Sequence, residues 1–190
     1  MDVYDAIHQR RSHRMYQPEM PPKEALERVI EAALWAPSGT NAQAWEITVM
    51  AGQVREKFVE LVSGAIKNLI PILQKAQVPE KGQELVMKFF KNLGGAPVVI
   101  AVTIFKNPDD PTGFNNIQSG AALFQNLLLA AQAEGLGTCW MTGAHSLEKE
   151  ILKFLGKENQ QLLAITPIGY SAKEPPAPPR KPRDVRWLGF

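Results

Sequence analysis

The sequence has 190 residues, of which 45% are hydrophobic and 21% are charged, and its formal net charge at pH 7 is +2. This composition excludes a largely disordered chain, and the near-balanced charge argues against binding of nucleic acid or a membrane over the whole surface. The one cysteine, Cys139, excludes an intrachain disulfide. A chain of this length is typical of one domain, so we expect a single domain over residues 1–190. Because no apolar leader or membrane-spanning run is visible, we expect the protein in the cytoplasm.

Helical spacing dominates the first part of the chain. Residues 3–9 predict a short helix that turns Val3, Ala6 and Ile7 inward. After a proline pair that ends at Pro22, apolar residues recur every three or four positions, which predicts a second helix. That helix should end before Pro37, because the residue preceding a proline disfavours helical backbone.

The remaining elements alternate between strands and helices. Alternating or continuously apolar runs predict strands at 45–49, 98–105, 138–142 and 162–170. Glycines and prolines predict that the helical stretch 54–92 is broken into shorter pieces. The longest helix, over 115–134, is apolar on most sides and therefore belongs in the domain core or in a subunit interface.

Residues 171–190 form a proline-rich tail that cannot be helical. It ends in Trp187, Leu188 and Phe190, which are large and apolar. Because such side chains favour burial, we expect the tail to fold back on its own domain or to reach a partner subunit.

Several well-known catalytic motifs are missing from the sequence. It has no GxGxxG, no GxxxxGK[ST] and no GxSxG, and its three histidines lack the spacing of zinc ligands. We therefore expect no metal site and no catalytic side chain, and infer that a reactive group would come from an organic cofactor.

A basic segment near the N-terminus carries the first candidate site. In extended backbone, Arg10, Ser12 and Arg14 share one side, which gives a row of guanidinium, hydroxyl and guanidinium groups. Such a row suits a phosphate monoester, because arginine donates in a planar fork and serine adds a neutral donor. The alternative is a solvated basic turn.

Two further segments suit a flat heterocycle. Asn41 and Gln43 carry amides that match the alternating donors and acceptors of a flavin pyrimidine edge, although asparagine is also common in ordinary turns. The glycines of residues 135–143 permit close backbone approach to a ring, beside Trp140 and Met141. The alternative is a glycine-capped helix followed by a buried strand, and for Cys139 we favour that alternative.

Together these residues resemble the nitroreductase family of FMN-dependent oxidoreductases. The resemblance extends over nearly the whole chain in five segments that occur in the family's order: 10–14, 36–45, 126–143, 167–170 and 179–182. It implies an α+β fold with a mixed β-sheet flanked by helices, and a homodimer with FMN at the subunit interface. It also implies a C-terminal extended tail that reaches the partner subunit.

The resemblance assigns roles to individual residues. On the side of the FMN phosphate it places Arg10, Arg11, Ser12, Arg14, Arg180 and Lys181. Against the ring, from the other subunit, it places Pro37, Ser38 and Gly39, and it gives the flavin edge to Asn41 and Gln43. Beside the isoalloxazine it places the strand with Trp140, Met141 and Thr142.

The implied activity is transfer of electrons from NADH or NADPH, through FMN, to a small organic acceptor such as a nitroaromatic or a quinone, by a ping-pong mechanism. Two departures from the family pattern bear on the ring: the loop reads Ser38-Gly39-Thr40 where a further serine or proline is common, and Ala44 stands where proline is usual. Residues 64–92 correspond to the most variable part of the family, which often shapes the acceptor pocket. One alternative is a reductive dehalogenase or a flavin-fragmenting relative on the same fold. A non-enzymatic module that binds an anion or RNA is the alternative of another class.

Overall fold

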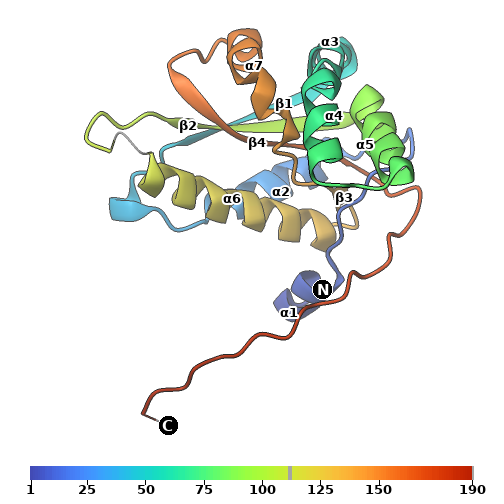
Figure 1. Cartoon of the computed structure of the whole chain (residues 1–190). Helices are drawn as coiled ribbons and strands as arrows, with labels where there is room; N and C mark the ends of the chain where they lie inside the picture. The colour runs from blue at the N-terminus through green and yellow to red at the C-terminus, as the bar shows by residue number, and fades with distance from the viewer. Residues whose placement is uncertain (111–112, 190) are drawn as a thin grey trace.

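A computed structural model describes residues 1–110 and 113–189, and in these residues a four-stranded sheet lies between two layers of helices (Figure 1). The strand order is β1-β2-β4-β3. The bounds are Trp45–Ala51 for β1, Val98–Phe105 for β2, Gly137–Thr138 for β3 and Gln160–Gly169 for β4. The long strands β2 and β4 are therefore central, and the short β3 is at the edge that receives the N-terminal segment.

The expected mixed sheet is wrong for these strands, because all three neighbouring pairs are antiparallel. Parallel pairing occurs at one isolated bridge in the described chain, between Ser12 and Thr138. Apolar periodicity shows which face of a strand is buried but carries no information on its direction. Long helical connections separate β1 from β2 and β2 from β4, so direction is decided only by packing.

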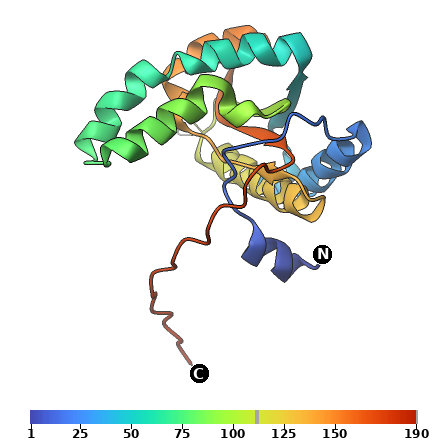
Figure 2. The same ribbon diagram turned by 90° about the vertical axis from the view of Figure 1, so that its right-hand side faces the viewer.

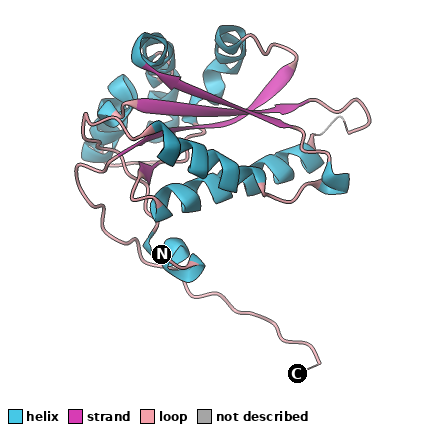
Figure 3. Cartoon of the chain, turned by 180° about the vertical axis from the view of Figure 1, so that it is seen from behind, coloured by secondary structure: helices cyan, strands magenta, loops and turns pink. Residues whose placement is uncertain are grey.

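Helices cover both faces of the sheet (Figure 3). One layer contains α2 and α6, with α1 packed against α6; the bounds are Val3–Gln9 for α1, Lys23–Leu34 for α2 and Phe114–Ala133 for α6. The other layer contains α3, α5 and α7, with α4 beside α5; the bounds are Gly52–Ser63 for α3, Ile66–Lys75 for α4, Glu80–Asn92 for α5 and Glu148–Leu155 for α7.

Strand β2 divides the core into two parts because its side chains alternate. Ile100 and Val102 face α2 and α6, whereas Val99 and Ala101 face the layer of α3, α5 and α7. Helix α6 lies close to the sheet at Gly120, where a Cβ atom would stand 2.9 Å from Ile104 and 3.0 Å from Leu163. The long apolar helix expected from the sequence therefore packs its buried side on the sheet of its own chain.

Helices α4 and α5 form a hairpin that extends away from the sheet (Figure 2). Of the residues of α4, all of which are described, none is buried. The base of the hairpin rests on the segment that follows β3, since Leu69 and Phe90 both lie within 3.2 Å of the place where a Cβ of Gly143 would stand. Residues 64–92 thus lie beside the segment that carries Trp140 and Thr142.

Both ends of the chain expose apolar side chains. Val3 and Ile7 of α1, expected to face inward, are 60% and 46% exposed. The tail is extended, lines a cavity with Ile7 and His8 of α1, and then runs away from the domain (Figure 1). Trp187 and Leu188 are each 69% exposed. Phe190 lies outside the described residues. These apolar side chains are therefore not buried within a single chain.

Candidate functional site

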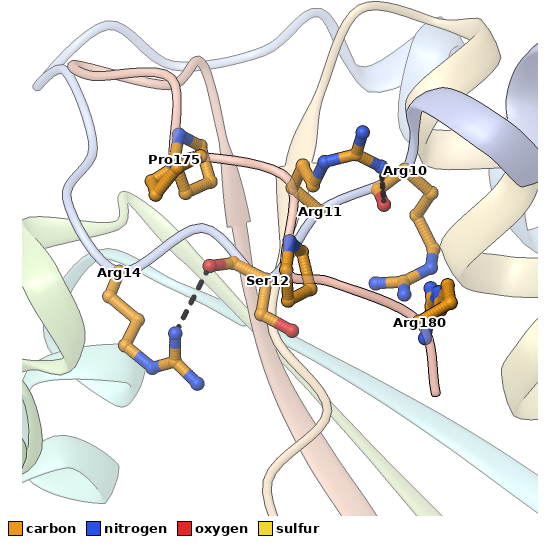
Figure 4. Close-up of a pocket in the computed structure, with 8 residues that line it drawn as sticks. Arg10, Arg11, Ser12, Arg14, Pro175 and Arg180 are labelled. Atoms are coloured by element: carbon orange, nitrogen blue, oxygen red, sulfur yellow. Dashed lines mark hydrogen bonds between the residues drawn. The ribbon is translucent and has the colours of Figure 1, made fainter. Parts of the chain in front are cut away.

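The basic N-terminal segment and the tail meet around one cavity of about 450 Å³ (Figure 4). Its lining combines four arginines, one serine and three prolines, from two distant parts of the chain: Arg10, Arg11, Ser12, Arg14, Pro175, Pro176, Pro178 and Arg180. We call this cavity the arginine cradle. The structure thus brings together five of the six residues expected on the phosphate side; Lys181, the sixth, is exposed and does not line it.

Local backbone explains how the cradle forms. Arg10 caps the C-terminus of α1, and the chain then becomes extended and runs along the edge strand β3. Ser12 bridges to Thr138, and the backbone N–H of His13 donates to the Thr138 carbonyl at 2.8 Å. Extended backbone places alternate residues on one side, and Figure 4 shows Arg10 and Arg14 on either side of the Ser12 hydroxyl.

Arg11 is oriented differently from its neighbours. Its guanidinium turns back toward α1 and donates to the His8 carbonyl at 2.6 Å and to the Arg10 carbonyl at 2.9 Å. It therefore caps the C-terminal end of α1, where carbonyl groups lack helical partners. Because its guanidinium is bonded to these carbonyls, Arg11 adds positive charge to the cradle but is not oriented to contact a bound anion directly.

The residues that line the cradle carry positive charge and include no aspartate or glutamate, although Glu174 precedes the lining residue Pro175. Burial lowers the pKa of Arg10, and the nearby charges of Arg180 and Arg11 lower it further. The ion pairs of the described chain join other residues, none of them an arginine of the cradle. Like charges held together in this way are stabilised by an anion, and guanidinium groups with a hydroxyl match the oxygens of a phosphate.

Cys139 lies directly below the cradle. The side chain is 3% exposed, and burial raises the pKa of its thiol, while Arg14, Arg10 and a hydrogen bond with Ser12 act in the opposite direction. The interpretation of Cys139 as a small core residue agrees with this burial.

The amides expected at the flavin edge lie in an exposed and strained loop. Thr40, Asn41 and Gln43 all have positive φ values, of 52°, 57° and 46°. Each such residue costs about 1–3 kcal/mol, and strain of this kind clusters at functional sites. The Ser38 hydroxyl holds the loop by accepting from the Gln43 N–H at 3.0 Å, and the Gln43 amide donates to Asn41 Oδ1 at 3.2 Å.

This loop and the arginine cradle lie at opposite ends of α6 (Figure 1). At the N-terminal end, the Phe105 N–H donates to the Ala44 carbonyl, and the Asn116 side chain donates to the Phe105 carbonyl. At the C-terminal end, α6 leads directly into β3, which bridges to Ser12. A helix of 20 residues is about 30 Å long, so the two groups of one chain do not face each other.

The strand residues expected beside a ring divide into three environments. Trp140 packs its ring on Phe124 of α6, with centroids 4.6 Å apart. Met141 is 4% exposed and belongs to the hydrophobic core, and its backbone N–H and carbonyl are both hydrogen-bonded to Ile165. Thr142 is exposed. The glycines in the sequence indicated this segment, but only the packing shows which of its side chains are free to contact a ligand.

Sequence reasoning missed two residues near the cradle. His13 is 4% exposed, and its Nδ1 lies 2.8 Å from the hydroxyl of Ser171 at the start of the tail. The only sequence signal was a histidine among arginines, and Ser171 had none.

Across residues 1–110 and 113–189, no group of three or more potential ligands is arranged to hold a metal ion. No helix in the same residues has the length and apolarity needed to cross a bilayer.

The described residues thus form an α+β domain with an arginine-lined cavity at one end of α6 and a strained amide loop at the other. The model of the nitroreductase family matches residues 7–170, and the chain belongs to that family. The oxidoreductase class and the nitroreductase-like fold expected from the sequence are thereby confirmed.

Relatives agree with this assignment. The chain is 30% identical to a Methanothermobacter thermautotrophicus protein provisionally described as an NADH dehydrogenase/NAD(P)H nitroreductase, over 92% of this chain and 80% of that protein. It is 29% identical to the iodotyrosine deiodinase of Thermotoga neapolitana, over 99% and 98% of the two chains. A Desulfitobacterium hafniense nitroreductase solved with bound FMN has 25% identity and a TM-score of 0.74, with 99% of each chain covered.

Proposed function

We propose that this protein is an FMN-dependent oxidoreductase that moves electrons from NADH or NADPH to a small organic acceptor, such as a nitroaromatic or a quinone, by a ping-pong mechanism. The observation that carries the proposal is the arginine cradle, in which guanidinium groups from both ends of the chain surround a serine hydroxyl. Bound FMN would supply the redox-active ring, since the chain offers no side chain suited to hydride chemistry.

The residues of the cradle fit a phosphate monoester. Burial and, after it, the charges of Arg180 and Arg11 lower the pKa of Arg10, and a phosphate dianion would offset both effects. Its oxygens would accept from Arg10, Arg14 and Arg180. The Ser12 hydroxyl, between these groups, adds a neutral donor. A carboxylate would leave part of the positive charge unbalanced, so a phosphorylated cofactor fits better.

A second copy of the chain would complete the site. The amide loop 37–43 lies the length of α6 from the cradle of its own chain, so a single chain offers either the phosphate contacts or the amides to one FMN. Exposed apolar groups flank both parts: Trp35 next to the loop is 80% exposed, and Tyr4 of α1 is 71% exposed. Their burial in a twofold interface would place each loop against the other subunit's cradle.

In this arrangement the protein contributes binding and orientation. The strained backbone of the loop presents Asn41 and Gln43 without further reorganisation, which lowers the entropic cost of binding the ring edge. Trp140, fixed on Phe124, would keep the neighbouring backbone in place. The hairpin of α4 and α5, which touches Gly143, would border the space left for the acceptor. We propose that the tail lies on the partner subunit, where Trp187 and Leu188 would lose their exposure to water.

Reconstitution followed by anaerobic titration tests the proposal. The purified protein is mixed with excess FMN, freed of unbound flavin and titrated with NADH and with NADPH while its absorption spectrum is recorded. We expect one flavin per chain and bleaching by at least one of the two nucleotides. A protein that stays colourless, or a bound flavin that neither nucleotide bleaches, would contradict it.

Reductive dehalogenation is a second candidate, favoured by a relative of nearly equal length. The chain and the Thermotoga neapolitana iodotyrosine deiodinase match over 99% and 98% of their lengths. Turnover of a nitroaromatic, a quinone and 3-iodotyrosine by the same reduced protein would separate the two candidates. Release of iodide at a rate above that of nitro or quinone reduction would favour the dehalogenase.

A further inference from the structure

His13 is a buried imidazole that the proposed function leaves without a role. It lies between Ser12 and Arg14, yet its side chain points away from the cradle lining and toward the start of the tail. The Nδ1 atom is 2.8 Å from Ser171 Oγ. Ser171 follows the end of β4, so this hydrogen bond joins the two segments that supply the cradle's arginines.

The partners of Ser171 define which atom donates. The Ser171 hydroxyl donates to the Lys173 carbonyl at 2.9 Å, which uses its one hydrogen. The oxygen must then accept from His13, so Nδ1 carries a hydrogen. The same oxygen also accepts weakly from the Lys173 N–H at 3.3 Å. Ser171 thus links the imidazole to the first turn of the tail. The backbone here is also held, by the bridge between Tyr16 and Ser171 and by the Ala172 N–H, which donates to the Met15 carbonyl at 3.0 Å, so the contact with His13 acts on the turn from Ser171 to Lys173.

His13 is held both through its backbone and through its ring. The backbone N–H of His13 donates to Thr138, and its carbonyl accepts from the Tyr16 hydroxyl at 2.8 Å. A Cβ atom on Gly137 would stand 2.7 Å from His13 Cγ, so the ring packs directly on the backbone of β3. A ring held in this way can fix the position of the Ser171 hydroxyl.

We infer that His13 is a positioning residue, which acts through Ser171 to direct the tail so that Arg180 lies opposite Arg10 in the arginine cradle. The inference rests on the proposed function only in that the bound phosphate belongs to FMN. The prolines at 175, 176 and 178 stiffen the path between Ser171 and Arg180, so an anchor at Ser171 is transmitted to the guanidinium.

Ligand binding by three variants tests the inference. Ser171→Ala removes the acceptor, and we expect FMN to bind about five- to tenfold more weakly. Riboflavin, which lacks the phosphate, should bind both proteins equally. Arg180→Ala should weaken FMN binding in the parent but add little in the Ser171→Ala background, because the guanidinium is already misplaced there.

Conservative replacement of His13 separates positioning from general packing. His13→Asn keeps an N–H close to the place of Nδ1 and should retain most of the FMN affinity, whereas His13→Leu should behave like Ser171→Ala. Should His13→Leu fail to fold, the comparison of Ser171→Ala with Arg180→Ala still decides the matter, because Ser171 is only half-buried.

Limited trypsin digestion of the protein without cofactor gives an independent readout. If Ser171→Ala frees Arg180 from the cradle, trypsin should cleave the Arg180–Lys181 bond faster in this variant than in the parent. In His13→Asn the rate should not change. Equal cleavage in all variants, or losses of FMN affinity that simply add, would overturn the inference and leave the proposed function intact. Failure of the parent protein to bind FMN would instead overturn the proposed function, while the digestion still decides the position of the tail.

Discussion

Arg10 and Arg180 lie next to each other although they come from opposite ends of the chain (Figure 4). The positive charge of Arg180 is one of the causes that lower the pKa of Arg10. Two guanidinium groups in such proximity repel each other unless an anion lies between them. An anion bound between them would remove this repulsion, as the proposed function requires.

Loss of Arg10 should weaken binding of FMN. Arg10→Ala removes a charge-assisted hydrogen bond of about 1.5–3 kcal/mol, which corresponds to about a tenfold to 150-fold higher Kd. Flavin fluorescence titration measures this change. Lys149→Ala, which removes a charge from α7 on the other side of the sheet, is the matched control. Equal affinities of parent and Arg10→Ala would count against a phosphate in the cradle.

A mixed dimer should recover sites that neither parent variant possesses. One variant carries Arg10→Ala and the other carries Asn41→Ala with Gln43→Ala, so each homodimer has two defective sites. If cradle and loop come from different subunits, random pairing restores roughly a quarter of all sites with full FMN affinity. Co-expression with two different tags, followed by flavin counting, measures the recovered fraction.

The matched control for that experiment pairs Arg10→Ala with Arg14→Ala. Both changes then fall in the arginine cradle, so no combination of subunits contains an intact site. Recovery in this control, or none in the cradle-and-loop mixture, would show that the two parts do not meet across a dimer interface.

Gly94 should tolerate alanine far less well than Gly135. Both residues have positive φ values, of 67° and 74°. A Cβ on Gly94 would overlap the Arg14 carbonyl, whereas a Cβ on Gly135 would meet nothing within 4 Å. We expect Gly135→Ala to lower the free energy of unfolding by about 1–2 kcal/mol and Gly94→Ala by roughly 2–5 kcal/mol. Urea denaturation of both variants checks the order, and similar losses would contradict the overlap.

Acid should destabilise the cofactor-free protein through His13. Burial lowers the pKa of this imidazole, the charges of Arg10 and Arg11 act in the same direction, and Glu174 acts against them. The unfolded chain therefore binds a proton that the folded chain does not, so stability falls as pH drops below about 6.5 and stops falling below the native pKa of His13.

His13→Asn should remove this part of the pH dependence, because asparagine does not titrate. Urea denaturation of the parent and of His13→Asn at a series of pH values measures it as the difference between two curves. Parallel curves across the range below about pH 6.5 would show that His13 has the same pKa in the folded and unfolded chains.

Elements with long and regular patterns could be predicted from the sequence. The helix expected at 115–134 is α6 at Phe114–Ala133, and the strand expected at 98–105 is β2. The strand expected at 138–142 is shorter: β3 ends at Thr138, and Met141 forms only an isolated bridge to Ile165. Where an apolar run is short and lies beside glycines, the ends of the strand depend on which residues pair with a neighbouring strand, and the run itself does not show this.

Alternation along extended backbone was by itself sufficient to bring Arg10, Ser12 and Arg14 to one side, because that geometry depends only on neighbouring residues. The sequence also determined the family, through segments whose order and spacing are specific. The family resemblance also placed Arg180 on the phosphate side. Only the tertiary structure decided that Lys181 does not line the cradle, that Ser171 accepts a hydrogen bond from His13, and that the amide loop lies at the far end of α6. Each of these depends on how distant segments pack, and the spacing of residues along the chain does not encode that packing.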